Sequence, residues 1–243
     1  MRPHLLLPLV LFTLAACGDD ATGTRDELVA WPDARFDERA GQSPIDIAPA
    51  TVVRFRSADP QINYGRVARV SKLERYDGTI KATLTGAHRI SIKGKSYALV
   101  QFHFHASSEH RVDGAQTPLE LHLVHQASDG ALAVIGVRFA LGRANPVIQQ
   151  LLDLTPAAGS PAVTPTSSFD LITLLPPLTS PYFTYSGSLT TEPFSEGLNW
   201  VVFRPTLTIS AEQLAQYRSL FPEDNARGVQ SLNGRIIFER VGE

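Results

Sequence analysis

Two stretches, Gln101-Phe102-His103-Phe104-His105 and Glu120-Leu121-His122-Leu123-Val124-His125, decide how this chain folds. Polar and apolar residues alternate in both, and this alternation is typical of a β-strand, whose alternate side chains share a face. We therefore expect the glutamine, the glutamate and the histidines before His125 to lie on one face of the strands. The phenylalanines, the leucines and His125 should pack on the opposite face. If the two strands are neighbours, three imidazoles converge on one point, those of His103, His105 and His122.

Further short runs of β-branched and aromatic residues recur along the chain, and turn residues bound each of them. Sequences such as Tyr76-Asp77-Gly78 and Ser128-Asp129-Gly130 favour tight turns between them. The predicted strands span residues 51–56, 79–85, 90–93, 96–105, 120–126, 131–140 and 199–205. The pattern predicts a mainly β fold, a single domain built on a large, mostly antiparallel twisted β-sheet.

A few short helices are expected at the periphery of this sheet. Asn145-Pro146 places a capping residue and then a proline at the start of an apolar run, which is a helix start signal. Ser210 and Gln213 have the spacing of a capping box, and a helical stripe of apolar residues follows. Residues 155–182 are rich in proline, serine and threonine, and we expect an ordered loop there because their apolar neighbours need covering.

The composition is that of an ordinary globular protein. Of the 243 residues, 19% are charged, and the formal net charge is -2. This balance gives neither the basic footprint of a nucleic-acid binder nor an acidic tail, so no nucleic acid is expected as a partner. Partners must therefore be inferred from a site.

The first residues differ from the rest. Residues 1–17 contain an apolar run too short to span a bilayer, which predicts an export signal, and Leu14-Ala15-Ala16-Cys17 resembles the processing box of bacterial lipoproteins. On this interpretation a lipid on Cys17 anchors the exported protein to the periplasmic or cell-surface side of a bacterial membrane, and residues 18–27 form a flexible tether. An ordinary cleaved signal is the alternative. The folded domain then covers residues 28–243 and contains no cysteine.

Three neutral histidine nitrogens with an open fourth position suit zinc in a catalytic role, because a structural zinc site closes its shell with four protein ligands. Gln101 and Glu120 each stand two residues before a histidine on the same face, where they can accept the other ring hydrogen and orient the imidazole. Strand histidines that line a polar groove or are satisfied in the core are the competing interpretation. Copper or nickel is also chemically possible with imidazoles alone, but the pattern favours zinc.

Several further strings give the chain a family resemblance. They are Gly41-Gln42-Ser43-Pro44-Ile45-Asp46-Ile47, Ser108-Glu109-His110, Gly187-Ser188-Leu189-Thr190-Thr191, Asn225-x-Arg227 and Asn233-Gly234-Arg235. Together with the two histidine strands, and in this order, they resemble the α-class carbonic anhydrases, and the short interval between His105 and Glu109 is similar to the bacterial branch. The resemblance implies the α-carbonic anhydrase fold and reversible hydration of carbon dioxide to bicarbonate and a proton by attack of zinc-bound hydroxide.

The resemblance also implies a role for each matching residue. His103, His105 and His122 would hold Zn²⁺, while Thr190 would accept a hydrogen bond from the zinc-bound hydroxide and donate its own to Glu109. The residues that would orient the three histidines are Gln101, Glu120 and, through its backbone carbonyl, Asn225. The pocket for carbon dioxide would be lined by Val124, Val134, Leu189, Thr191 and Trp200.

The implied small-molecule partners are carbon dioxide and bicarbonate, and anions and sulfonamides are the implied inhibitors. Membrane contact is expected through the lipid anchor only. The sequence leaves the oligomeric state open, a homodimer included.

The chain departs from this family at the turn where many active members carry a histidine that exports the proton. Here the turn is Tyr76-Asp77-Gly78-Thr79, and we expect His88, nearby in the sequence, to be an ordinary surface histidine. Proton transfer should then be slow or depend on the buffer. Glu192 replaces a usual proline and is expected to be solvated, although it could instead extend toward the cavity. Pro44 and Pro193 match positions that are cis in relatives.

Two other functions stay open. A non-catalytic zinc-binding module on the same scaffold would require that the reactive groups be lost, whereas the three histidines and the Thr190 and Glu109 pair are present. A zinc esterase would use the same hydroxide on carbonyl substrates. The sequence therefore predicts a carbonate dehydratase and leaves both alternatives to experiment.

Overall fold

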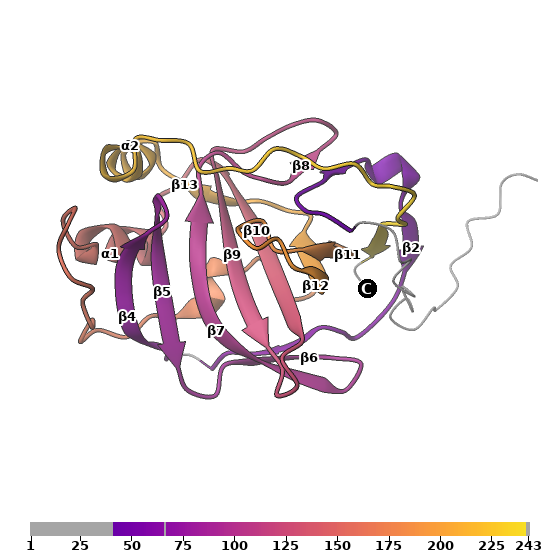
Figure 1. Cartoon of the computed structure of the whole chain (residues 1–243), viewed down its shortest axis with the longest axis horizontal. Coiled ribbons are helices and arrows are strands. Elements are labelled where there is room, and N and C mark those ends of the chain that lie inside the picture. Colours follow the sequence, from indigo (N-terminus) through magenta and orange to yellow (C-terminus); the bar gives the residue numbers. More distant parts are fainter. Residues whose placement is uncertain (1–40, 66, 242–243) are drawn as a thin grey trace, which may run out of the picture.

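A large twisted sheet forms the centre of the part of the chain that the computed structural model describes, residues 41–65 and 67–241 (Figure 1). The strands of the described residues are β1 (Asp46–Ile47), β2 (Val53–Phe55), β3 (Gln61–Asn63), β4 (Arg69–Tyr76), β5 (Thr79–Thr85), β6 (Arg89–Ile92), β7 (Lys95–His105), β8 (Arg111–Val112), β9 (Leu119–Gln126), β10 (Leu132–Leu141), β11 (Tyr182–Ser188), β12 (Glu196–Phe203), β13 (Leu207–Ile209) and β14 (Phe238–Arg240).

The main sheet has twelve of these strands. Their principal order is β2-β14-β11-β12-β10-β9-β7-β5-β4, and β13 pairs with β10, β6 with β7 and β3 with β6. β1 and β8 form a separate short pair. The two strands that carry the histidine pattern, β7 and β9, are neighbours near the middle of this order, as the sequence pattern requires.

Most neighbouring strands are antiparallel, as predicted, but the sheet is mixed. β10 runs parallel to β12 and β13, and β14 runs parallel to β2. Parallel neighbours need a crossover connection. Here the chain leaves β10 through the helix α1 (Pro146–Leu154), a long loop and β11 before it returns beside β10 as β12.

Both predicted helices are present, and they contact each other beyond the β4 end of the sheet (Figure 1). α1 begins after Asn145, whose side chain accepts hydrogen bonds from two amides of the first turn. α2 (Ala211–Leu220) begins with the predicted capping box between Ser210 and Gln213. The loop over residues 155–182 contains the 3-10 turn η2 (Leu171–Leu174) and buries Phe169, Leu171, Leu174 and Leu175 against the core, as expected.

The sequence pattern does not predict β4, β11 or the short strands β1, β3, β8, β13 and β14. Four of the eight residues of β4 are charged, because this strand lies at the edge of the sheet. β11 contains Gly187, where a Cβ would lie 2.2 Å from the Ser43 hydroxyl oxygen. The Ser43 side chain therefore lies too close for any side chain at position 187. The predicted strand over 51–56 shortens to β2 and is preceded by the 3-10 turn η1 (Pro49–Thr51).

Two hydrophobic clusters lie on the opposite faces of the central strands. The larger one contains Phe102, Phe104, Leu121 and Leu123 and includes the buried side of the helices. The smaller one contains Val124, Val134 and Trp200. β7 and β9 therefore contribute alternate residues to two separate cores, which confirms the predicted facing of both strands and places the histidines beside the smaller cluster.

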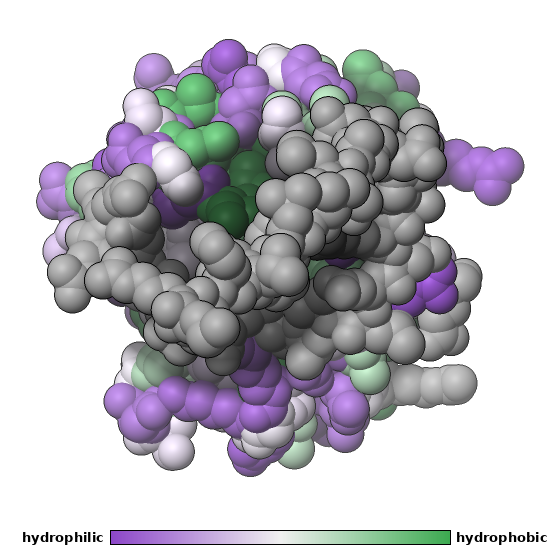
Figure 2. All heavy atoms as spheres, turned by 90° about the vertical axis from the view of Figure 1, so that its right-hand side faces the viewer, coloured by the Kyte–Doolittle hydropathy of each residue, from purple (hydrophilic) through white to green (hydrophobic). Residues whose placement is uncertain are grey.

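The predicted signal over residues 1–17, with Cys17, and the tether over 18–27 lie outside the described residues. Within the described part of the chain, no helix has the length and apolar character needed to cross a membrane. Figure 2 shows the side of the molecule that lies on the right in Figure 1, where the described surface is mainly hydrophilic.

We expect Ser210→Ala to lower the free energy of unfolding by about 1 kcal/mol, because the first turn of α2 loses the hydroxyl that accepts from the Gln213 amide. Urea unfolding measures the change. Ser219→Ala is the matched control, since this exposed hydroxyl donates to the Gln216 carbonyl late in the same helix, and its effect should stay below about 0.5 kcal/mol. Equal losses in both variants would contradict a specific contribution of the cap.

Candidate metal centre

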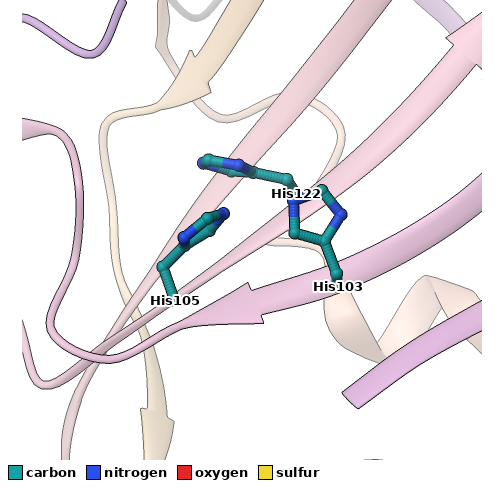
Figure 3. A group of neighbouring side chains, drawn as sticks. All are labelled: His103, His105 and His122. Carbon is teal, nitrogen blue, oxygen red and sulfur yellow. The ribbon is translucent and has the colours of Figure 1, made fainter. Parts of the chain in front are cut away.

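Three histidines converge on the face of the sheet that carries the smaller cluster (Figure 3). His103 and His105 belong to β7, and His122 on β9 is the direct register partner of His103. The centroid of the His105 ring lies 5.0 Å from that of His103 and 4.5 Å from that of His122. One nitrogen of each ring lies within 4.8 Å of the others, so a single ion can contact all three.

Two of the rings are held by the acceptors that the alternation predicts. Nδ1 of His103 lies 2.9 Å from Oε1 of Gln101, and Nε2 of His122 lies 3.1 Å from Oε1 of Glu120. A hydrogen bond at one nitrogen fixes the tautomer and the orientation of the ring. It leaves Nε2 of His103 and Nδ1 of His122 for an ion.

His105 takes its acceptors from other segments. Its Nδ1 lies 3.2 Å from the carbonyl oxygen of Asn225 and 3.3 Å from Oε1 of Glu109. Its Nε2 is buried and has no hydrogen-bond partner among the described residues. Leaving a buried polar atom unpaired is costly, so a nitrogen in this position fits a metal ligand.

All three imidazoles are held in the neutral form. Burial, with the neighbouring charge of His122, lowers the pKa of His105 to about 3. Burial also lowers the pKa of His103 and that of His122, although Glu120 acts in the opposite direction on His122. A neutral imidazole has a free lone pair, so these rings can bind a metal at neutral pH without first losing a proton.

A second buried group, His110 and Glu120 with His122, also lies within metal-binding distance. Both nitrogens of His110 are engaged, however, since Nδ1 lies 2.7 Å from Oε1 of Glu120 and Nε2 lies 2.7 Å from the Tyr185 hydroxyl. Burial would raise the pKa of Glu120, but His110 and His122 outweigh this effect and hold that pKa well below its usual value. We interpret this group as a hydrogen-bond network that supports His122, a role of His110 that the sequence analysis misses.

Glu109 and Thr190, the predicted catalytic pair, are both buried and close together. Oε1 of Glu109 accepts a 2.8 Å hydrogen bond from the Arg227 amide. The Thr190 hydroxyl interacts with the same carboxyl group, although Oε2 has no well-formed hydrogen bond among the described residues. Burial raises the pKa of Glu109 to about 8, and hydrogen bonding to Thr190 and Arg227 opposes this rise. A divalent cation at the histidines would also oppose it and favour the carboxylate.

Apolar side chains lie beside the histidines. Val134 is the register partner of Val124 on one side and of Trp200 on the other. The centroid of the Trp200 ring lies 4.8 Å from that of His122, and Leu189 packs against the same cluster. The structure thus brings together four of the five residues predicted to line an apolar pocket.

A cavity of about 400 Å³ opens beside the histidines. Among the predicted residues it is lined by Gln101, His103, His105, Thr191 and Asn225. The remaining wall contains the turn where many family members carry the proton-exporting histidine, and three residues that the sequence analysis misses. The turn residues are Tyr76, Asp77, Gly78 and Thr79, and the three missed residues are Lys81, Glu223 and Asp224. A charged residue on a strand ordinarily indicates a solvent-facing position, and only the pairing of β5 with β7 brings Lys81 to the histidines.

The turn that lacks the family's histidine is tightly fixed. Thr79 is buried, and its hydroxyl lies 2.6 Å from the Phe104 carbonyl oxygen and 3.0 Å from the Tyr217 hydroxyl. The expectation of a surface histidine at position 88 is wrong, because His88 is buried with its Nδ1 against the Tyr64 carbonyl. It is not among the residues that line the cavity.

Glu192 is exposed and does not line the cavity, in agreement with the solvated interpretation. The peptide bonds that precede Pro44 and Pro193 are both cis.

The fold and the site define a class of protein, one that presents three neutral histidines able to hold a metal ion on one face of a large β-sheet, beside a buried carboxyl and hydroxyl pair. A family model described as eukaryotic-type carbonic anhydrase matches residues 28–241. The chain belongs to this family, the α-class carbonic anhydrases, which are zinc lyases that hydrate carbon dioxide.

Individual relatives agree with this assignment. The chain is 41% identical over 197 residues to a carbonic anhydrase of Pectobacterium atrosepticum, covering 81% of this chain and 79% of the relative. It is 36% identical over 198 residues to a carbonic anhydrase of Klebsiella pneumoniae, with 82% and 79% covered. The solved α-carbonic anhydrase of Thermovibrio ammonificans in complex with the inhibitor sulfanilamide superposes with a TM-score of 0.77 at 38% identity, covering 82% of this chain and 86% of that one.

We expect the stability of the metal-free protein to depend on pH through Glu109. Between about pH 4.5 and about pH 8 the unfolded chain has released this proton while the folded chain retains it, so the free energy of unfolding falls as the pH rises. The slope from this one group is at most about 1.4 kcal/mol per pH unit.

Glu109→Gln removes this titration, whereas the titrations of the histidines stay in both proteins. Urea unfolding of chelator-treated wild type and variant should therefore show the stability of the variant, relative to wild type, increasing from about pH 5 to about pH 8. A difference that is constant across this range would contradict the raised pKa.

Proposed function

We propose that this chain catalyses the reversible hydration of carbon dioxide at a zinc ion held by His103, His105 and His122. The observation that carries the proposal is the convergence of three neutral histidine nitrogens, one of which, Nε2 of His105, is buried without a partner among the described residues. Three nitrogen donors with no fourth ligand among the described residues match the donor set of a catalytic zinc site.

Zinc supplies a nucleophile at neutral pH, because it lowers the pKa of a bound water molecule to about 7, a value for which carbonic anhydrase is itself the standard example. The residues of this chain then set direction and selectivity. With Glu109 ionised, the Thr190 hydroxyl donates its hydrogen to that carboxylate, so only its lone pairs are left for a further hydrogen bond. Thr190 then accepts only from a group that carries a proton, which orients the nucleophile and rejects aprotic ligands.

The apolar cluster supplies a place for the substrate. Carbon dioxide has no net charge and no hydrogen to donate, so the wall formed by Val124, Val134, Leu189 and Trp200 suits it better than a charged one. This wall adjoins His122 through Trp200, which places the apolar site next to the proposed ion.

Export of the proton is the step for which this chain is poorly equipped. Apart from the proposed ligands, no histidine is among the described residues that line the cavity. The hydroxyl of Thr79 is bonded inside the protein, and threonine does not titrate near neutral pH. We therefore propose that proton transfer to the buffer limits turnover.

We expect stopped-flow hydration of carbon dioxide to be slow in a bulky, poorly penetrating buffer and to rise on the order of tenfold or more with imidazole, because an acceptor with a pKa near 7 replaces the missing group. Asp77→His should reproduce part of this gain without imidazole. Asp77 is exposed and lines the cavity, whereas a histidine at position 79 would break the bonds of Thr79.

His88→Gln is the matched control, since it alters a histidine that does not line the cavity, and it should leave the imidazole response unchanged. Rapid turnover without any response to imidazole would contradict the proposed limitation. Zinc-loaded protein with no hydration activity in any buffer would favour the non-catalytic module, and a higher efficiency on esters than on carbon dioxide would favour the esterase.

We expect His105→Ala to abolish stoichiometric zinc binding, whereas His110→Asn should retain one zinc ion per chain, with affinity lower by about 10- to 100-fold at most. The reason is that Nε2 of His105 is unpaired, while both nitrogens of His110 are already hydrogen-bonded. Metal analysis after dialysis, with competition against a chelator, measures both. Zinc retained by His105→Ala and lost by His110→Asn would assign the ion to the second group.

Sulfonamide inhibition is proposed by analogy with the sulfanilamide complex of the Thermovibrio ammonificans relative. Export, and anchoring by a lipid on Cys17, stay predictions from the sequence. Mass spectrometry of the mature N-terminus from membranes would test both.

A further inference from the structure

We propose that Lys81 and Gln101 form an anion-binding subsite in the wall of the metal cavity, which selects ligands that carry a carboxylate or a similar small anion close to the group bound at the metal. The proposal rests on the zinc site proposed above. The subsite would determine which ligands bind in the cavity and would leave the binding of the ion unchanged.

The position of Lys81 follows from the pairing of the strands. Lys81 on β5 is the direct register partner of His103 on β7, so both side chains project from the same face of the sheet. Both residues line the cavity, together with Gln101. A cation is thereby fixed one strand away from the proposed metal ligands.

The ammonium group of Lys81 is available to a ligand. Its Nζ lies 3.8 Å from the centroid of the Tyr76 ring, and it forms no ion pair with a carboxylate of the described residues. A cation–π contact holds the charge in place without neutralising it. An ammonium group has three hydrogens to donate, and a ring face occupies only one side of it.

Gln101 adds a second donor to the same wall. Its Oε1 accepts a hydrogen bond from Nδ1 of His103, which fixes the orientation of the side-chain amide. The oxygen is thereby occupied, and the NH₂ group is left for a ligand. The NH₂ group of this amide has no hydrogen-bond partner among the described residues, and Gln101 is only half-buried. A positive charge and an amide donor on one wall are the groups that recognise a carboxylate.

Three carboxylates, those of Asp77, Glu223 and Asp224, also line the cavity and limit which anions fit. All three side chains belong to exposed residues, whereas Lys81 is half-buried. Charges exposed to solvent are screened by salt and water more than partly buried ones. Lys81 should therefore favour a negative charge held inside the cavity, while the exposed carboxylates disfavour one that extends to the solvent.

The test compares two sulfonamides of equal shape that differ in charge, benzenesulfonamide with a para-carboxylate and with a neutral para-carboxamide. Dissociation constants for the zinc-loaded full chain are measured by calorimetry or displacement for wild type, Lys81→Gln, Lys81→Arg and Lys95→Gln. Lys95→Gln removes the same charge at a surface pair with Asp129 that is not part of the cavity, and is the matched control.

The preference for the carboxylate over the carboxamide should fall by about two- to fivefold in Lys81→Gln, which is the range of a partly exposed ion pair. It should be kept in Lys81→Arg and in Lys95→Gln, and it should weaken in wild type as salt is added. The neutral ligand should bind wild type and Lys81→Gln equally, which shows that the metal site is intact.

Equal carboxylate preference in wild type and Lys81→Gln would overturn the subsite while leaving the zinc site in place. An equal loss in Lys95→Gln would also overturn it, because the effect would then be one of net charge. If neither sulfonamide binds to wild type, the proposed zinc site fails, and the subsite fails with it.

Discussion

The register between β7 and β9 is the constraint on which the rest of the site depends. It sets His103 opposite His122 and leaves His105 on the same face. Because side chains alternate strictly along a strand, a slip of one residue would turn the imidazoles into the larger hydrophobic cluster and expose Phe102 and Phe104 in their place. Burial of these aromatic rings therefore stabilises the register that also brings the three histidine nitrogens to one point.

The second feature of the site is a buried network of polar groups. This network orients His122 and is distinct from the nitrogens that could bind an ion. Glu120 joins His122 to His110, and the Tyr185 hydroxyl continues the chain of hydrogen bonds from His110 to the Ser43 hydroxyl. Such a network is rigid when each member has a partner. At the centre, Nε2 of His105 and Oε2 of Glu109 stay without a hydrogen-bond partner among the described residues, and a cation held by the histidines would occupy the first of them.

Much of this arrangement could be predicted from local patterns. The alternation in β7 and β9 gave the facing of the histidines, the spacing of Ser210 and Gln213 gave the start of α2, and the capping asparagine before proline gave α1. What could not be predicted depends on contacts between distant segments. The parallel neighbours of β10 follow from the path of the chain after it, and the burial of His88 follows from the segment that contains Tyr64.

The hairpin between β4 and β5 contributes one wall of the cavity and also holds the strand that carries two of the histidines. Thr79 supports the sheet beneath the histidines, because its hydroxyl accepts from the Phe104 amide and lies 2.6 Å from the Phe104 carbonyl oxygen and 3.0 Å from the Tyr217 hydroxyl. The hydroxyl at this position is thus committed to fixing the strand that carries His103 and His105. Two residues further along, Lys81 lines the cavity. On the two proposals made above, this wall holds the negative charge of a bound ligand, whereas the released proton passes to the buffer.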